Sequence, residues 1–321
     1  MSVSVQPAIP SFEVRLTAPD ISSWIEGNTG IPGFTTRDSG ESGPHAALLC
    51  ITHGNEIAGA IVLDRLMRAG LVPSRGKLTF GFVNPAAFER FDPKQPTLSR
   101  FVDEDINRVW DTAVLDSLRH SVELERARAI RPLLDTVDVL LDLHSMLWPS
   151  DPLSLCGETE KGRLLAKGIG VPELVVSDHG HLSGKRIIDY QRFASPDTPY
   201  AANLVEAGQH WQPRTVEVML ATVAGLLRHL NMAPEGRGLP PPPQPGLQRF
   251  AEVTMPVTAR TGGFVFVQPW HGCDVIPERN TLIAMDGQTE IRTPHDQCLL
   301  VMPSLRPSRG HTAVRLARFR D

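Results

Sequence analysis

Between residues 46 and 230, short apolar runs of strand length alternate with segments of helical periodicity. Continuous apolar runs of about four to eight residues are typical of strands that are covered on both faces. Repeated strand and helix units of this kind predict an α/β fold, with a mostly parallel or mixed sheet flanked by helices. The predicted strands are 46–52, 77–83, 137–144, 173–177 and 202–206, and the predicted helices are 57–67, 118–134, 159–169 and 213–230.

The segments on either side of this region have a different composition. Residues 1–44 are rich in Gly, Pro, Ser and Thr, and the alternating stretch 12–16 is typical of an edge strand. A run of Pro and Gly at 234–246 cannot continue a helix, and it predicts an extended linker. Short β-branched segments with little helical period follow it. We therefore expect an α/β domain over 1–233 and a small C-terminal all-β domain over 247–321.

The composition of the 321-residue chain is that of a globular protein. Hydrophobic residues make up 41% and charged residues 21%, which excludes a wholly disordered chain. The formal net charge is -4 and there is no run of Lys or Arg, so nucleic acid is not expected as a partner. No apolar run reaches the roughly 18 residues of a membrane span, and the N-terminus lacks a signal-peptide pattern. We therefore expect a cytoplasmic protein without a membrane partner.

Side chains that can bind a metal ion stand at the carboxyl ends of two predicted strands. His53 and Glu56 directly follow the strand 46–52, and His144 ends the strand 137–144. Open α/β sheets place their sites at this edge. Two imidazoles and one carboxylate, with a fourth position for water, form the open ligand set of a catalytic zinc site. Taken alone, a His and a Glu three residues apart are more often solvated loop residues, so this pair decides little by itself.

Further motifs stand before and after these residues, in a fixed order. The chain reads His53-Gly54-Asn55-Glu56, Asn84-Pro85-Ala86-Ala87, Arg100, Asp105-Ile106-Asn107-Arg108, Asp142-Leu143-His144 and Glu206-Ala207-Gly208. In this order the motifs resemble those of the succinylglutamate desuccinylase and aspartoacylase family, which is related to the zinc carboxypeptidases. The resemblance extends over about residues 46–210, and the trailing β segment also suits it. It implies a zinc-carboxypeptidase-like α/β fold.

The resemblance implies roles for the residues at the strand ends. It implies that His53, Glu56 and His144 hold one Zn²⁺ per chain, which polarises a water and the scissile carbonyl. It also implies that Glu206 is the general base and acid. This carboxylate would take a proton from the metal-bound water and return it to the departing amine.

Four polar residues before the strand 137–144 also take their roles from the resemblance. Arg108, together with Asn107, resembles the clamp of a substrate carboxylate, because a planar guanidinium can bind a carboxylate through two hydrogen bonds. Arg100 resembles the residue that stabilises the tetrahedral oxyanion, with a structural salt bridge as the alternative. Asp105 resembles the carboxylate that orients a metal-bound imidazole, which we expect to be that of His53.

The sequence gives weaker indications of whether other polar residues belong to the site. His179 and His181 resemble a metal pair, but the ligand set is complete without them, so we expect them on a loop or rim. Tyr190 and Tyr200 are the two tyrosines of the chain. The sequence leaves open whether either one reaches the site as a phenolic donor.

Together these roles predict a zinc-dependent amidohydrolase that acts on the linear amide of a small N-acyl amino acid or a related N-acyl compound. A carboxypeptidase-like metallopeptidase is the alternative within hydrolysis, because it uses the same metal and arginine chemistry. A non-catalytic zinc-stabilised binding protein is the alternative outside enzymes, and the presence of Glu206, Arg100 and Arg108 argues against it. The acyl group, the amino acid and a homo-oligomeric state stay open.

Overall fold

The computed structural model describes residues 12–181, 183–234, 238–241 and 248–320. They form two compact units. The α/β unit consists of Val14–Ser145 and Pro152–Arg249, and the β unit consists of the described residues among Met1–Glu13, Met146–Asp151 and Phe250–Asp321. Within the linker predicted at 234–246, residues 235–237 and 242–246 lie outside the described residues. The predicted domain boundaries stay a prediction.

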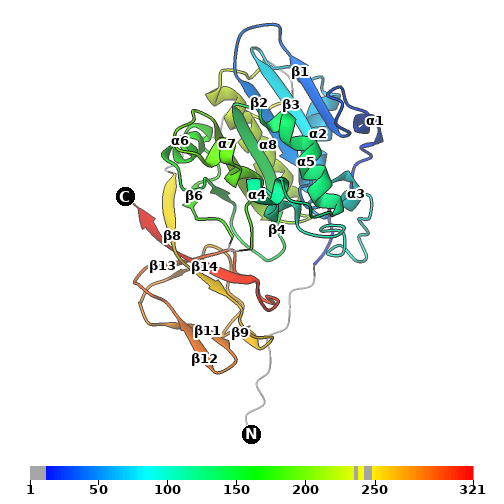
Figure 1. The fold of residues 1–321 in the computed structure, drawn as a ribbon. Coiled ribbons are helices and arrows are strands. Elements are labelled where there is room, and N and C mark those ends of the chain that lie inside the picture. Colours follow the sequence, from blue (N-terminus) through cyan, green and yellow to red (C-terminus); the bar gives the residue numbers. More distant parts are fainter. Residues whose placement is uncertain (1–11, 182, 235–237, 242–247, 321) are drawn as a thin grey trace. The chain divides into compact units, whose positions relative to one another are not determined.

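The α/β unit is built on a mixed sheet (Figure 1). Its strands are β1 (Phe34–Asp38), β2 (His45–Cys50), β3 (Lys77–Phe82), β4 (Val139–Met146), β5 (Leu153–Leu155), β6 (Leu174–Ser177) and β7 (Ala201–Gln209), in the spatial order β1-β3-β2-β4-β7-β5-β6. Strand β2 runs parallel to both β3 and β4, and β5 runs parallel to β6. Strand β1 is antiparallel to β3, and β7 is antiparallel to β5. Nearly every residue of β2, β4 and β7 is buried, so both faces of the central strands are covered, as their apolar runs predicted.

Four long helices accompany this sheet, and they are α2 (Ile57–Arg68), α5 (Val122–Leu134), α6 (Glu160–Ile169) and α8 (Pro213–His229). Helix α8 packs against α2, α6 and strand β7. Helix α5 begins later than the sequence predicted, because the Ser121 hydroxyl caps it by accepting the Leu124 N–H at 3.0 Å. Helix α6 ends at Ile169, and Gly170 follows it with a φ of 79°, the left-handed conformation typical of the residue after a helix.

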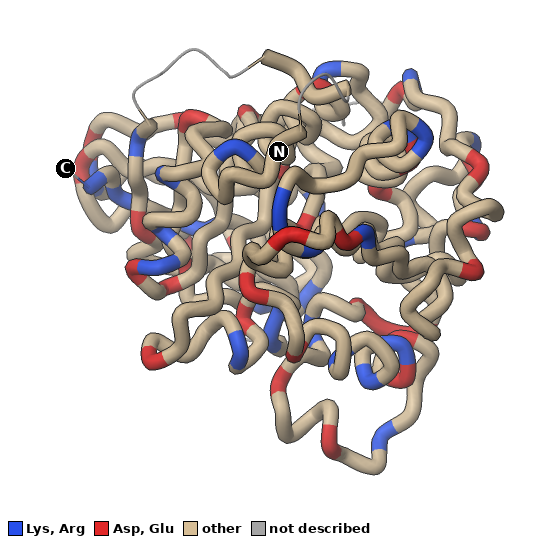
Figure 2. The backbone as a smooth tube through the Cα atoms, turned by 90° about the horizontal axis from the view of Figure 1, so that it is seen from above, with Lys and Arg blue, Asp and Glu red and all other residues tan. Residues whose placement is uncertain are grey.

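Shorter helices occupy the connections of the α/β unit. They are α1 (Ser22–Ile25), α3 (Pro85–Phe88), α4 (Thr112–Leu115) and α7 (Gln191–Ala194), with 3₁₀ turns at Ile106–Arg108 and Ile187–Asp189. None of the helices in the described part of the chain is long and apolar enough to cross a bilayer. In Figure 2, acidic and basic residues are interspersed along the described backbone, in keeping with the small net charge of -4.

The secondary structure of the β unit consists of antiparallel strands, which confirms the all-β character expected for the C-terminal segment. Its strands are β8 (Arg249–Thr258), β9 (Phe264–Phe266), β10 (Val275–Ile276), β11 (Leu282–Asp286), β12 (Thr289–Arg292), β13 (Cys298–Val301) and β14 (Thr312–Arg320). They pair in the orders β8-β14-β13-β10 and β12-β11-β9. The core of this unit includes Phe264, Phe266 and Leu300.

The edge strand expected at 12–16 is wrong, because these residues form no strand. Strand β1 lies at the edge instead, where it pairs with β3 and buries Phe34 completely. The stretch 12–16 alternates in sequence like a strand, but Arg15 donates its backbone N–H to the carbonyl of Trp211 outside any ladder, at 3.1 Å. Alternation over five residues is therefore too short a signal to decide pairing here.

Candidate active site

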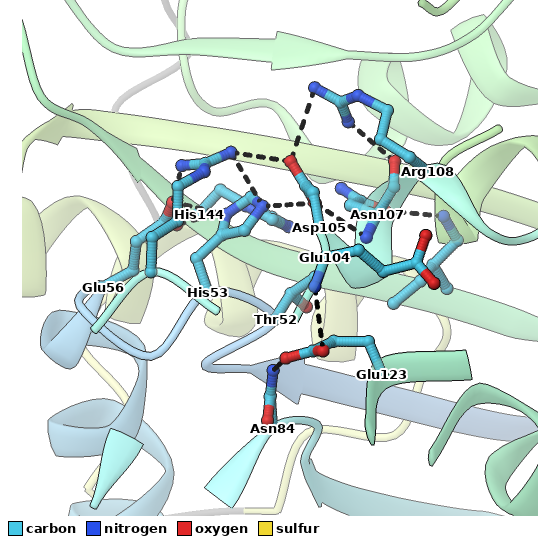
Figure 3. A network of polar contacts seen from close by, with 12 residues as sticks. Thr52, His53, Glu56, Asn84, Glu104, Asp105, Asn107, Arg108, Glu123 and His144 are labelled. Carbon is cyan, nitrogen blue, oxygen red and sulfur yellow. Dashed lines mark hydrogen bonds and ion pairs between the residues drawn. The ribbon is translucent and has the colours of Figure 1, made fainter. Parts of the chain in front are cut away.

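Three buried side chains converge at the carboxyl ends of β2 and β4 (Figure 3). His53 and Glu56 lie in the turn between β2 and α2, and His144 lies on β4. Nδ1 of His53 is 2.7 Å from Oε1 of Glu56, and Nδ1 of His144 is 3.1 Å from Oε2. One potential ligand atom from each residue lies within 4.8 Å of the others. Because β2 and β4 are parallel neighbours, their carboxyl ends bring these residues together.

The charge state of Glu56 follows from its two imidazole neighbours. Burial raises the pKa of the Glu56 carboxyl, but the charges and hydrogen bonds of His53 and His144 outweigh burial and hold this pKa well below its usual range. The Glu56 side chain is 2% exposed. The site therefore contains an ionised carboxylate between two imidazole nitrogens.

A second carboxylate holds each imidazole from its other side. Nε2 of His144 lies 2.7 Å from Oδ2 of Asp142, and Nε2 of His53 lies 3.0 Å from Oδ1 of Asp105. The Thr52 hydroxyl donates to Oδ1 of Asp142 at 2.9 Å. Once Nδ1 has lost its proton to make room for a metal ion, an Nε2–H that donates to a carboxylate leaves Nδ1 with a lone pair, and this arrangement is typical of histidines that bind metal. The donor set and its supports therefore fit a divalent metal ion.

The turn that carries His53 depends on a glycine. A Cβ atom at Gly54 would lie 2.4 Å from the carbonyl carbon of Ala87 and 2.5 Å from the carbonyl oxygen of Ser99. Any side chain would therefore push this turn away from the segment around Ser99 and Arg100. Gly54 also donates its N–H to the carbonyl of Arg100 at 3.1 Å, which ties the two segments together.

Arg100 lies beside the candidate ligands. Its Nη2 is 3.1 Å from Oδ2 of Asp105 and 2.9 Å from Nε2 of His53. Burial lowers the pKa of Arg100, but the nearby carboxylates of Asp105, Glu56 and Glu206 raise it above its usual value. The side chain is 38% exposed, so the guanidinium is partly accessible to another molecule.

Arg108 and Asn107 lie on the same 3₁₀ turn, next to Asp105. Nη2 of Arg108 is 3.7 Å from Oδ2 of Asp105, and its Nη1 donates to the carbonyl of Asn107 at 2.7 Å. The carbonyl oxygen of the Asn107 side chain accepts the N–H of Ile187 at 2.7 Å, so it joins this turn to the turn Ile187–Asp189. Both arginines therefore lie near one carboxylate oxygen, Oδ2 of Asp105. Figure 3 shows Arg108 beside Asp105.

Glu206 lies on β7, next to β4 in the sheet. It is 7% exposed and opposite Leu153 in the ladder with β5. Its charge contributes to the raised pKa of the Arg100 guanidinium.

A profile of the succinylglutamate desuccinylase/aspartoacylase catalytic domain matches residues 42–230. The chain belongs to this family. This membership confirms the resemblance seen in the motifs, and the matched region includes every residue assigned above to the candidate site. A comparison with curated protein sequences gave no match.

Several solved structures of the family's fold are similar to this chain. Succinylglutamate desuccinylase from Vibrio cholerae has a TM-score of 0.65 and 16% identity, over 90% of this chain and 86% of that one. A succinylglutamate desuccinylase/aspartoacylase from Rhodobacter sphaeroides has a TM-score of 0.64 and 17% identity, over 90% and 89%. An ectoine utilization protein from Ruegeria pomeroyi has a TM-score of 0.60 and 15% identity, over 88% of each chain. At these identities the likeness shows the fold.

Two residues that follow β7 lie at the site, and the motifs did not point to them. His210 is buried, and its Nδ1 lies 2.7 Å from the hydroxyl of Ser145. Burial lowers the pKa of His210 to about 4, so the ring is neutral near neutral pH. Trp211 packs at 5.1 Å from the His210 ring and donates its Nε1–H to the carbonyl of Asn55 at 2.9 Å. The family motifs end at Gly208, so no spacing signal marks these two residues.

The remaining polar residues considered in the sequence bond to other parts of the chain. The Tyr190 hydroxyl donates to Asp135 at 2.7 Å, and the Tyr200 ring lies 3.5 Å from the guanidinium carbon of Arg192. His179 is an exposed residue in contact with Glu158. Together with His181 it lines a cavity of about 190 Å³, which the candidate metal ligands do not line.

Proposed function

We propose that this chain is a zinc-dependent deacylase that hydrolyses the amide bond of a small N-acyl amino acid or a related N-acyl compound. The observation that carries the proposal is the convergence of His53, Glu56 and His144 within 4.8 Å, with a carboxylate on the far nitrogen of each imidazole. Membership of a family of deacylases supports it. The proposal includes one Zn²⁺ per chain.

The proposed metal would be held by Nδ1 of His53, Nδ1 of His144 and a carboxylate oxygen of Glu56. When bound, Zn²⁺ supplies a Lewis acid that polarises a carbonyl and lowers the pKa of a water. Asp105 and Asp142 keep the two rings turned so that their Nδ1 atoms face Glu56.

Glu206 is the proposed proton carrier. An Oε atom of its carboxylate accepts the proton of the attacking water and later delivers it to the nitrogen of the departing amine. Glu206 is 7% exposed and lies on β7, next to β4, the strand that carries His144. Its charge also contributes to the raised pKa of the Arg100 guanidinium.

The two arginines have different proposed roles. Arg100 stabilises the negative charge that develops on the carbonyl oxygen, because its guanidinium lies beside the ligands and is partly exposed. Arg108, on the turn that Asn107 joins to Ile187, binds the substrate carboxylate. The alternative for Arg100 is a purely structural ion pair with Asp105, at 3.1 Å.

A substrate panel tests the proposed function. It compares N-acetyl and N-succinyl amino acids with short unblocked peptides, and it measures the release of free primary amine with and without a chelator. We expect N-acyl amino acids to be hydrolysed, and we expect chelation to remove this activity. Preferred hydrolysis of peptides would favour the metallopeptidase instead. Zinc binding without turnover of any substrate would favour the non-catalytic binding protein. A cytoplasmic location without nucleic-acid or membrane partners stays a prediction.

A further inference from the structure

We infer that His210 and Trp211 hold two segments of the proposed metal site in place relative to strand β7, which carries Glu206. The first segment is the turn with His53 and Glu56, and the second is the end of β4 with His144. We call the contacts of His210 and Trp211 with these segments the brace. This inference rests on the proposed metal site. It assigns positioning roles to two buried residues that lie directly after β7 and outside the motifs of the ligands.

Trp211 holds the first of these segments. Its indole Nε1–H donates to the carbonyl of Asn55 at 2.9 Å, and Asn55 lies between His53 and Glu56 in the chain. The same turn is closed by the Glu56 N–H, which donates to the carbonyl of His53 at 3.1 Å. The Trp211 side chain is 1% exposed, so water cannot readily replace this hydrogen bond.

His210 holds the second segment through Ser145, which directly follows His144. The Ser145 hydroxyl lies 2.7 Å from Nδ1 of His210. The backbone N–H of Ser145 donates to Oε2 of Glu56 at 3.0 Å. A displacement of Ser145 would therefore move both the end of β4 and a ligand carboxylate.

These contacts connect the end of β7 to the two segments of the site along two branches. From the end of β7, one branch runs from His210 through Ser145 to Glu56, and the other runs from Trp211 to Asn55 in the turn that carries Glu56. The two aromatic rings pack on each other, with centroids 5.1 Å apart. Because Glu206 lies on the same strand, the brace sets the position of the ligands relative to the proposed proton carrier.

Metal release is the measurement that separates this role from general support of the fold. Substitution of residues that hold metal ligands in place typically weakens metal affinity by about 10- to 100-fold. Trp211→Phe keeps an aromatic ring but removes the donor to Asn55, so we expect Zn²⁺ release to a competing chelator to become at least about 10-fold faster. The absorption spectrum of the Co²⁺-loaded variant should change as well, because that spectrum reports the geometry of the ligands.

Trp110→Phe is the matched control. Trp110 is completely buried and packs on Tyr190 at 5.7 Å, but its Nε1 has no hydrogen-bond partner among the described residues. We expect Trp110→Phe to release Zn²⁺ at the wild-type rate. If Trp211→Phe releases Zn²⁺ no faster than Trp110→Phe, the inference is overturned.

A pair of substitutions at His210 tests the other branch, and it decides the question even if Trp211→Phe does not fold. His210→Asn can place a polar atom near the position of Nδ1, whereas His210→Phe keeps a ring without a polar atom. We expect His210→Asn to release Zn²⁺ almost as slowly as the wild-type protein, and we expect His210→Phe to release it faster. Equal, wild-type release from both would refute the brace. If the wild-type protein itself binds no Zn²⁺, the proposed function fails, and the inference that rests on it fails with it.

Discussion

The connection that carries Arg100 and Asp105 is held by one buried carboxylate, that of Glu123, in the first turn of α5 (Figure 3). One carboxylate oxygen accepts the N–H of Val102 at 2.6 Å and the side-chain amide of Asn84 at 3.0 Å. The other accepts the N–H groups of residues 103 and 104 at 3.0 and 3.1 Å. Glu123→Ala would therefore leave four donors without their acceptor.

The size of the effect follows from where these donors lie. An unsatisfied buried donor costs about 1–3 kcal/mol, and a donor that water can reach costs less. Asn84 is 1% exposed, whereas residues 102–104 are at least partly exposed. We therefore expect Glu123→Ala to lower the free energy of unfolding by about 3–5 kcal/mol. For a domain of this size, that loss corresponds to a fall of roughly 10 °C in Tm.

Thermal unfolding of Glu123→Ala and Glu125→Ala tests this reasoning. Glu125 lies in the same helical turn, but it is exposed and contacts His120 and Arg128, so its loss should cost less than about 1 kcal/mol. Amide hydrogen exchange should also become faster at residues 102–104 in Glu123→Ala alone. Melting temperatures within about 2 °C of each other, with unchanged exchange at 102–104, would refute the account of Glu123.

Three further substitutions test the proposed roles at the site. His144→Ala should lose both metal and activity, and full metal content in the purified variant would remove His144 from the ligand set. Glu206→Gln should keep its metal and fold while kcat falls by about 10²-fold or more; loss of metal would instead make Glu206 a ligand. Arg108→Ala should lower kcat/KM for carboxylate-bearing substrates by an amount that corresponds to a loss of about 2–3 kcal/mol in transition-state stabilisation. Arg108→Lys should recover little of this loss. An equal loss on a neutral amide analogue would contradict the clamp.

The secondary structure of the α/β unit could be predicted closely, because its central strands are apolar on both faces and each long helix has a buried apolar side. The predicted strands 77–83 and 173–177 correspond to β3 and β6, and the predicted helix 213–230 corresponds to α8. Strand β5 was not predicted, because three residues are too few to show a period. The antiparallel pairing of β5 with β7 depends on distant contacts that no local pattern indicates.

The site was only partly predictable for a similar reason. Residues at the ends of parallel strands must meet at one edge of the sheet, so the convergence of His144 with the turn after β2 could be expected. Asp142 could have been found as well, because residues two apart on a strand share a face. The roles of Glu123 and His210 could not, since each contacts a residue far along the chain, Val102 for Glu123 and Ser145 for His210, that only folding brings near.

Metal reconstitution tests whether a single zinc site carries the activity. The protein is first stripped with a chelator, and Zn²⁺ is then added back in steps while amine release from an N-acyl amino acid is measured. We expect the stripped protein to be inactive, and we expect activity to rise linearly and to stop at about one equivalent of Zn²⁺ per chain. Full activity in the metal-free protein, or activity that needs a second equivalent, would contradict a single zinc site at His53, Glu56 and His144.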